Sequence, residues 1–198
     1  MNEKVDKNPD PSALGLFGLA MVTLVASTQK LGITEGLTLV LPWAIFLGSF
    51  AQLIAGILDY KKNNVFGATA FCAFGLFWLA VAFTWMSYMG AFGEVLAAGA
   101  NLDMRQFGFA FIGYFIFSFY MTIGSLKTNK VLFAIFFFIV LLFTFLSLQT
   151  FGIAASTTGF LAGLSELAIA ILSFYLSAAN VLNIHYGKQV LPVGKPFL

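Results

Sequence analysis

Charged side chains are scarce in this sequence, and cysteine and histidine are almost absent. Only 9% of the 198 residues are charged, and the chain contains one cysteine and one histidine. Water-soluble domains have about 25% charged residues, so this chain lacks the polar groups needed to cover a water-facing surface. The net charge of +2 is small and its lysines are scattered, which argues against binding to nucleic acid.

The same scarcity leaves little material for catalysis. Cys72 has no second cysteine with which to form a disulfide or a thiolate metal site within one chain. The single histidine is His185, and Glu166 is the only carboxylate well inside an apolar segment. These three residues form no recognisable catalytic or metal-binding set. We therefore expect no enzymatic activity, no metal and no cofactor.

Long hydrophobic segments are what the sequence has in abundance. Hydrophobic residues make up 60% of the chain, and mean hydropathy is +0.94. A transmembrane helix needs about 20 mainly apolar residues. The sequence predicts an all-α integral membrane protein with the bilayer as its partner and six spanning helices. They cover approximately residues 13–28, 37–58, 66–88, 107–126, 131–149 and 160–181.

The distribution of basic residues predicts the orientation of these helices. With six spans, one side of the membrane receives eight lysines and the other receives only Lys30 and Arg105. Cytoplasmic segments are enriched in Lys and Arg, so both termini are expected in the cytoplasm of a multi-pass plasma-membrane protein. The corresponding division is a tail at residues 1–12, a transmembrane domain at 13–183 and a second tail at 184–198.

Three isolated polar features allow more than one interpretation. Glu166 is either a proton-linked carboxyl on a transport path or a group near the outer face that reaches water or a neighbouring helix. His185 follows the last predicted span and is read as an interfacial histidine. Asp103 and Arg105 flank the fourth span, where a local ion pair or helix cap is expected.

Several short motifs, in order along the chain, carry a family resemblance. The N-terminal part contains Asn8-Pro9-Asp10-Pro11 followed by Phe17-Gly18, and the second span contains a Gly-x-x-x-Gln segment from Gly48 to Gln52. Residues 59–71 read DYKKNNVFGATAF, and the C-terminal part contains VLN at 181–183 and VLPVG at 190–194. Together these motifs resemble the acetate uptake transporter family over nearly the whole chain.

That resemblance implies a protomer of six helices around its own pore, assembled as a homohexamer. It implies transport of acetate and related short monocarboxylates, with succinate in some members. It also implies a constriction of one residue each from the first, third and fifth spans, which corresponds here to Phe17, Phe74 and Ile139. The family's tyrosine in the third span is replaced by Phe74, so the constriction is expected to be drier.

A path for acetate needs hydrogen-bond donors beside apolar surface, because the ion has a carboxylate end and a methyl end. Asn8, Gln52 and Thr69 are candidate donors. The helix start after the Pro9 and Pro11 motif offers free N–H groups to an anion. The alternative is that Asn8 and Ser12 cap this helix, and the two roles are compatible.

Three functions remain open on this reading. The first is a channel or proton-coupled transporter for monocarboxylates. The second is a pore for another small solute, such as ammonia or formate. The third is a membrane protein that acts in assembly or sensing rather than in transport.

Overall fold

The computed structural model describes residues 9–93 and 103–198, and within these ranges every regular element is helical. Six helical spans are long and apolar enough to cross a membrane, which confirms the predicted fold class. The second span, Leu41–Lys61, is continuous but is divided into α2, η1 and α3. The elements are α1 Ser12–Lys30, α2 Leu41–Trp43, η1 Ala44–Ala51, α3 Gln52–Lys61, α4 Val65–Tyr88, α6 Met104–Ser125, α7 Lys130–Thr150 and α8 Ala155–His185.

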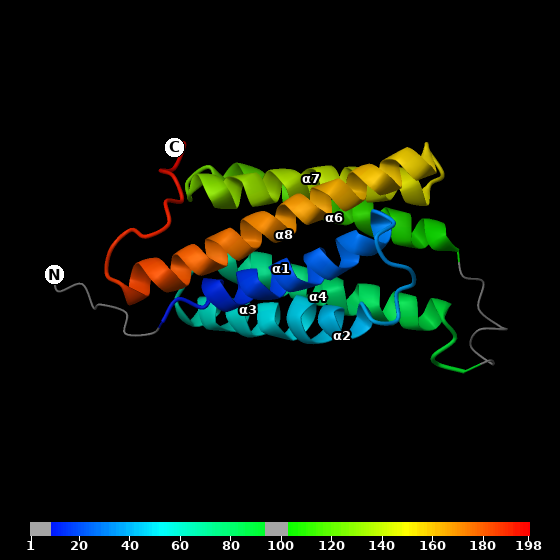
Figure 1. Ribbon diagram of the computed structural model, residues 1–198, viewed down its shortest axis with the longest axis horizontal. Helices are drawn as coiled ribbons and strands as arrows, with labels where there is room; N and C mark the ends of the chain where they lie inside the picture. The colour runs from blue at the N-terminus through cyan, green and yellow to red at the C-terminus, as the bar shows by residue number, and fades with distance from the viewer. Residues whose placement is uncertain (1–8, 94–102) are drawn as a thin grey trace.

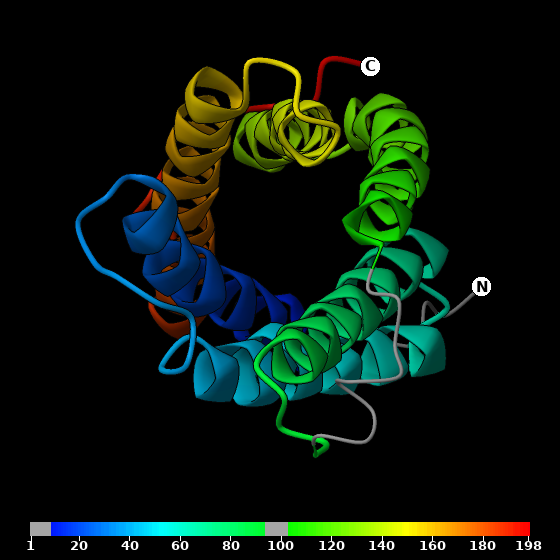
Figure 2. The ribbon, with the colours of Figure 1, turned by 90° about the vertical axis from the view of Figure 1, so that its right-hand side faces the viewer.

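The spans run side by side along the long axis of the molecule, and the C-terminal segment lies at the same end as the start of α1 (Figure 1). We call this end the terminal face and the opposite end the distal face. Seen from the distal face, the helices form a ring (Figure 2). Around it, α1 packs on α8, α8 on α7 and α7 on α6, while α4 packs on the η1–α3 segment, which returns to α1.

Polar residues before three helices fix where those helices begin. Asn64 accepts a hydrogen bond from the backbone N–H of Gly67, and Asn129 accepts one from Leu132. Asp103 accepts from the N–H of Arg105 and also pairs with its guanidinium at 2.7 Å, which confirms the expected cap and ion pair. These caps satisfy N–H groups that have no partner within the helix.

The last helix is longer than the sequence indicated. It starts at Ala155 rather than near residue 160 and includes His185, which is exposed and lies edge-on to Tyr186 at 5.4 Å. Its 31 residues correspond to about 46 Å, more than the roughly 30 Å of a hydrocarbon core. The helix accordingly crosses the others at a slant (Figure 1).

The C-terminal motif folds back onto the bundle. The side chain of Asn183 accepts hydrogen bonds from the N–H groups of Val190 and Leu191, at 2.7 and 2.9 Å. The Tyr175 hydroxyl donates to the carbonyl of Pro192 at 2.7 Å. These contacts give the asparagine and proline of the motif a structural role at the terminal face.

Small residues allow the helices of the ring to approach closely. A methyl group added at Gly48 would meet Trp78 of α4 at 2.8 Å and Val22 of α1 at 3.1 Å. Gly48 therefore lies where three spans meet. At Gly113, on the exposed side of α6, an added methyl would meet nothing within 4 Å.

We expect Gly48→Ala to destabilise the fold by about 1–3 kcal/mol, because α1 and α4 must move apart to admit the methyl group. Gly113→Ala is the matched control and should leave stability unchanged or slightly raised. The free energy of unfolding of both variants is measured by reversible unfolding in mixed detergent. Equal stability of the two variants would contradict the packing assigned to Gly48.

Candidate functional site

The ring of helices encloses a cavity of about 310 Å³ in its distal half, which we call the distal cavity. Most of its wall is apolar, and Trp78, Val81 and Trp85 of α4 form one side of it. Its polar lining consists of Gln29, Lys30, Gln149, Thr150 and Glu166. The cavity therefore offers an apolar surface together with charged and amide groups.

A second cavity of about 260 Å³, the terminal cavity, lies in the opposite half of the ring. The first turns of α1, α4 and α7 all contribute to its wall. Helix N-termini carry partial positive charge, which favours an anion, while the carboxylate of Asp10 in the same wall opposes it. Its polar lining residues are Asp10, Ser12, Gln52, Asn64, Thr128, Asn129 and Asn180.

A narrow apolar region, the plug, separates these two cavities. It encloses a void of only about 20 Å³, close to the minimum for a single water molecule. It shares residues with the cavity on each side of it. Its lining is Leu19, Thr23, Phe74, Phe77, Trp78, Ile139, Leu142, Phe143 and Ile169.

Among its described lining residues, the plug has two polar groups, the hydroxyl of Thr23 and the indole N–H of Trp78. The Thr23 hydroxyl donates to the carbonyl of Leu19 within the same helix at 2.7 Å. Phe74 is 5% exposed and lies against other rings, with Phe117 at 5.4 Å and Phe143 stacked at 6.5 Å. An ion would lose most of its hydration here, and a single indole N–H replaces little of it, so the plug is a barrier to hydrated ions.

The structure brings together two of the three residues expected in the constriction. Phe74 and Ile139 both line the plug. Phe17 does not, because it is 40% exposed and its ring faces Phe174 of α8 at 6.2 Å. Leu19 takes the place expected for Phe17. The sequence did contain a signal for this, since residues 12, 16, 19 and 23 lie on one face of a helix.

Gln52 is fully buried and lines the terminal cavity, as expected of a candidate binding residue. It follows the π-helical segment η1, and its amide nitrogen donates to the carbonyl of Gly48 at 2.7 Å. Its amide oxygen is buried without a hydrogen-bond partner among the described residues. Such a free acceptor is available to an O–H or N–H group of a solute.

The other candidate binding residues are less well placed. Asn8 lies outside the described residues. Pro9 is exposed, Pro11 is buried at the start of α1, and Thr69 is partly buried, and none of these three lines either cavity. The expected capping by Ser12 is wrong, because Asp10 accepts the hydrogen bond from the Ser12 N–H at 2.9 Å.

Glu166 lies deeper in the bundle than the sequence suggested. It is eleven residues after the start of α8 at Ala155, about three turns in, and it is 2% exposed. Its carboxylate pairs with the ammonium of Lys30, the last residue of α1, at 2.9 Å. Both side chains line the distal cavity, and sequence reasoning had not linked them.

The geometry fits a membrane pathway, and comparison with known proteins gives it a family. Residues 2–194 match the model of the GPR1/FUN34/yaaH family. This chain belongs to that family. It is 35% identical over 191 residues to the succinate-acetate/proton symporter SatP of Escherichia coli strain K12, covering 96% of this chain and 97% of that protein.

Two further comparisons bear on fold and function within the family. A solved structure of the bacterial acetate channel SatP matches with a TM-score of 0.86 and 32% identity, over 95% of this chain and 100% of that one. The ammonia transport outward protein 2 of Saccharomyces cerevisiae is 31% identical over 180 residues, covering 89% of this chain and 63% of that protein. These three proteins are named as transporters or channels.

The two-cavity arrangement predicts which positions water-soluble reagents can reach. In a Cys72→Ala background, Asn180→Cys should react with a membrane-impermeant thiol reagent added at the terminal face only. Gln149→Cys should react from the distal face only. Ile169→Cys, in the plug, should react from neither. Mass spectrometry of labelled vesicles of known orientation measures this, and labelling of one site from both faces would contradict a closed plug.

Proposed function

We propose that this protein transports acetate and related short carboxylates, including succinate, across the plasma membrane through a pathway within each protomer. The observation that carries the proposal is the pair of cavities separated by one small plug, in a chain of this family. The printed names of the SatP relative and of the matching acetate channel support carboxylates as the cargo.

The chemistry of the cavities suits a small amphipathic anion. In the distal cavity, the Lys30 ammonium, paired with Glu166, lies beside the apolar wall formed by Val81 and Trp85. In the terminal cavity, the Asn180 amide and three helix N-termini can interact with a carboxylate, and the free amide oxygen of Gln52 can accept from a protonated carboxyl, while Asp10 adds a negative charge. The methyl and carboxylate ends of acetate each find a matching surface on both sides of the plug.

Specific roles follow from these positions. We assign the constriction to Leu19, Phe74 and Ile139, and a substrate contact to Gln52. The excess of lysines at the terminal face supports cytoplasmic termini. A homohexamer remains part of the proposal because the family resemblance implies it, and the many apolar side chains on the outer surface suit contact with lipid or with neighbouring protomers.

Ammonia is the second candidate cargo, because the ammonia transport outward protein 2 is a relative over 89% of this chain. A neutral ammonia molecule would cross the apolar plug at a lower desolvation cost than an ion. The ion pair in the distal cavity favours carboxylates instead, because ammonia carries no charge for Lys30 to recognise.

Uptake of radiolabelled acetate into proteoliposomes tests the proposal. Vesicles containing the folded protein should take up acetate faster than empty vesicles, and short monocarboxylates should compete while sugars and amino acids should not. Uptake at the level of empty vesicles would refute carboxylate transport. Ammonia-driven alkalinisation of the lumen without acetate uptake would favour the second cargo.

Variants at the plug test the assignment of the constriction. Leu19→Ala should raise flux severalfold and weaken selectivity against larger carboxylates, because a wider plug dewets less readily. Phe17→Ala removes a comparable apolar group on the same helix outside the plug, and should lower thermal stability without changing selectivity. Both are measured as flux per assembled oligomer. The reverse pattern would return Phe17 to the constriction.

Phe74→Tyr gives a milder test, because it adds one hydroxyl at little change in volume. The hydroxyl can hydrogen-bond a passing carboxylate, so we expect a change in acetate rate or affinity with assembly intact. Acetate flux per assembled oligomer is measured as for Leu19→Ala. An unchanged rate and affinity would remove Phe74 from the path.

A further inference from the structure

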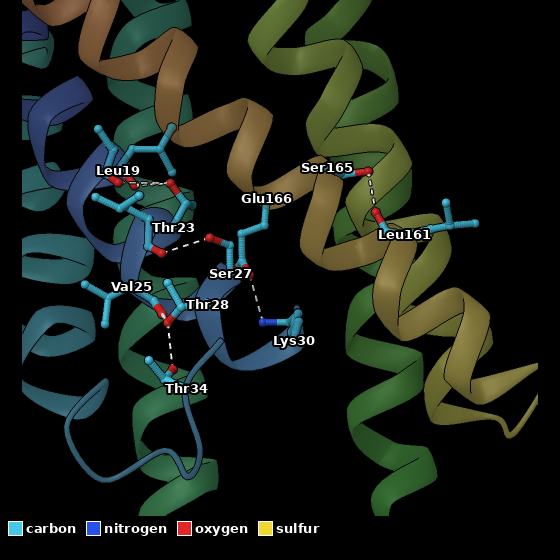
Figure 3. Close-up of polar contacts among 12 residues, drawn as sticks. Leu19, Thr23, Val25, Ser27, Thr28, Lys30, Thr34, Leu161, Ser165 and Glu166 are labelled. Atoms are coloured by element: carbon cyan, nitrogen blue, oxygen red, sulfur yellow. Dashed lines mark hydrogen bonds and ion pairs between the residues drawn. The ribbon is translucent and has the colours of Figure 1, made fainter. Parts of the chain in front are cut away.

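The distal cavity contains an ion pair that the proposed function leaves unexplained. The ammonium of Lys30 and the carboxylate of Glu166 are 2.9 Å apart, and their side chains are 14% and 2% exposed. Figure 3 shows Glu166 extending from α8 toward Lys30 at the end of α1. Glu166 precedes the plug residue Ile169 by one helical turn. Glu166 therefore begins near the barrier, whereas Lys30 is about two helical turns beyond the plug residue Thr23 on α1.

Close packing of two helices makes this contact possible. A methyl group added at Gly163 would meet the Cβ of Lys30 and the side chain of Leu31, each at 3.0 Å. Gly163 is three residues before Glu166 and on the same face of α8. The missing side chain lets the end of α1 lie against α8, which brings the ammonium within reach of the carboxylate.

A contribution to stability alone does not explain this buried ion pair well. Two charges buried in a membrane protein are costly, and a buried ion pair is often no more stabilising than apolar residues of the same volume. Glu166 and Lys30 lie on a cavity wall, where a solute can reach them. Ionisable groups inside a membrane generally mark a pathway for ions or protons.

Charge balance indicates how the pair would respond to a carboxylate. Of the described residues that line the distal cavity, only Lys30 and Glu166 are ionisable. With both charged, the cavity is neutral, and an entering anion would leave it with an uncompensated negative charge at low dielectric. If a proton from water binds Glu166 at the same time, the anion and the ammonium balance each other. Binding of the anion and of the proton are then linked.

Among the residues that the structure describes, the surroundings contain no other group that would take over this role. On α8 itself the next titratable residue is Tyr175, beyond the plug. The helices packed on α8 are α1 and α7, in which the only ionisable residues are Lys30 and, at the terminal end, Lys130. Across the cavity, Arg105 of α6 is paired with Asp103, and neither lines this cavity. Glu35 is exposed in the segment after α1.

We propose that Lys30 and Glu166 together form a binding site for one carboxylate anion and one proton in the distal cavity. The anion accepts hydrogen bonds from the ammonium of Lys30, which has three N–H groups and uses one on Glu166. The proton is taken from water by the Glu166 carboxylate, and no bond to carbon forms or breaks. The site rests on the proposed function and specifies its cargo as an anion recognised together with a proton.

Methanesulfonate is a suitable probe, because it resembles acetate in shape but stays ionised throughout the pH range used, so any pH dependence belongs to the protein. Its binding to the purified, assembled protein is measured by calorimetry between pH 5 and 8, with proton uptake recorded in weak buffer. The wild type should bind more weakly as pH rises, by up to about tenfold per pH unit, and take up one proton per anion.

Glu166→Gln is the informative variant. Its amide mimics the protonated carboxyl and cannot titrate, so binding should be independent of pH, without proton uptake. Asp103→Asn is the matched control, since it neutralises the acid of the other ion pair near the distal face. Hydrogen bonds from Arg105 lower the pKa of Asp103 to about 2, so Asp103 stays ionised over this range and the variant should behave as the wild type.

Lysine 30 is tested with its partner removed, because Lys30→Gln alone would leave a buried carboxylate without its cation. Lys30→Gln combined with Glu166→Gln removes both charges. This variant should still unfold cooperatively as an assembled oligomer, but should bind methanesulfonate more weakly than Glu166→Gln at every pH. Binding by this double variant with wild-type affinity would overturn the proposal. So would no methanesulfonate binding by the wild type at pH 5, or wild-type pH dependence in Glu166→Gln.

Acetate flux separates this inference from the function on which it rests. If wild-type vesicles show no flux above empty vesicles, the proposed function fails. If they show flux, and Glu166→Gln transports acetate with the wild-type pH profile, transport stands and the joint site for anion and proton fails.

Discussion

The lipid bilayer offers no hydrogen bonds, and the architecture of this protein follows from that constraint. Backbone groups in the hydrocarbon region must bond within each helix, so the described residues form six helical spans. The same constraint applies to side chains. The Thr23 hydroxyl returns to its own helix, and the Lys30 and Glu166 charges pair with each other. Among the buried polar and charged residues of the described chain, Gln52 and Glu166 are the ones that line the two cavities.

Close approach at small residues determines how the ring encloses space. Gly48 admits Trp78 and Val22, and Gly163 admits the end of α1. Where helices meet closely the ring is sealed, while large rings such as Phe74 and Phe77 extend inward to form the plug. The barrier thus depends on aromatic side chains held by neighbouring rings, and the cavities depend on the spacing that the glycines permit.

The sequence was sufficient for the membrane fold and insufficient for the details of the path. Apolar runs separated by polar turns are a strong signal, so six helices could be predicted, with α8 too short because its polar first turn reads as a loop. Of the three residues expected in the constriction, Phe74 and Ile139 line the plug and Phe17 does not. The prediction missed Leu19, because an assignment by motif does not measure which way a side chain points. The partner of Glu166 was missed because Lys30 is 136 residues away, and only the packing of α1 on α8 brings them together.

The two cavities attract anions by different physical means, and this difference gives the pathway a direction. The terminal cavity offers the N-termini of α1, α4 and α7, whose partial charges are fixed by the backbone, together with the carboxylate of Asp10. The distal cavity relies on Lys30, whose charge is balanced by a group that can take up a proton. Joint binding of an anion and a proton, as proposed, would make loading from the distal side sensitive to pH. If the termini lie in the cytoplasm, as proposed, that side faces the exterior, and an external proton would favour loading of the carboxylate before it meets the plug.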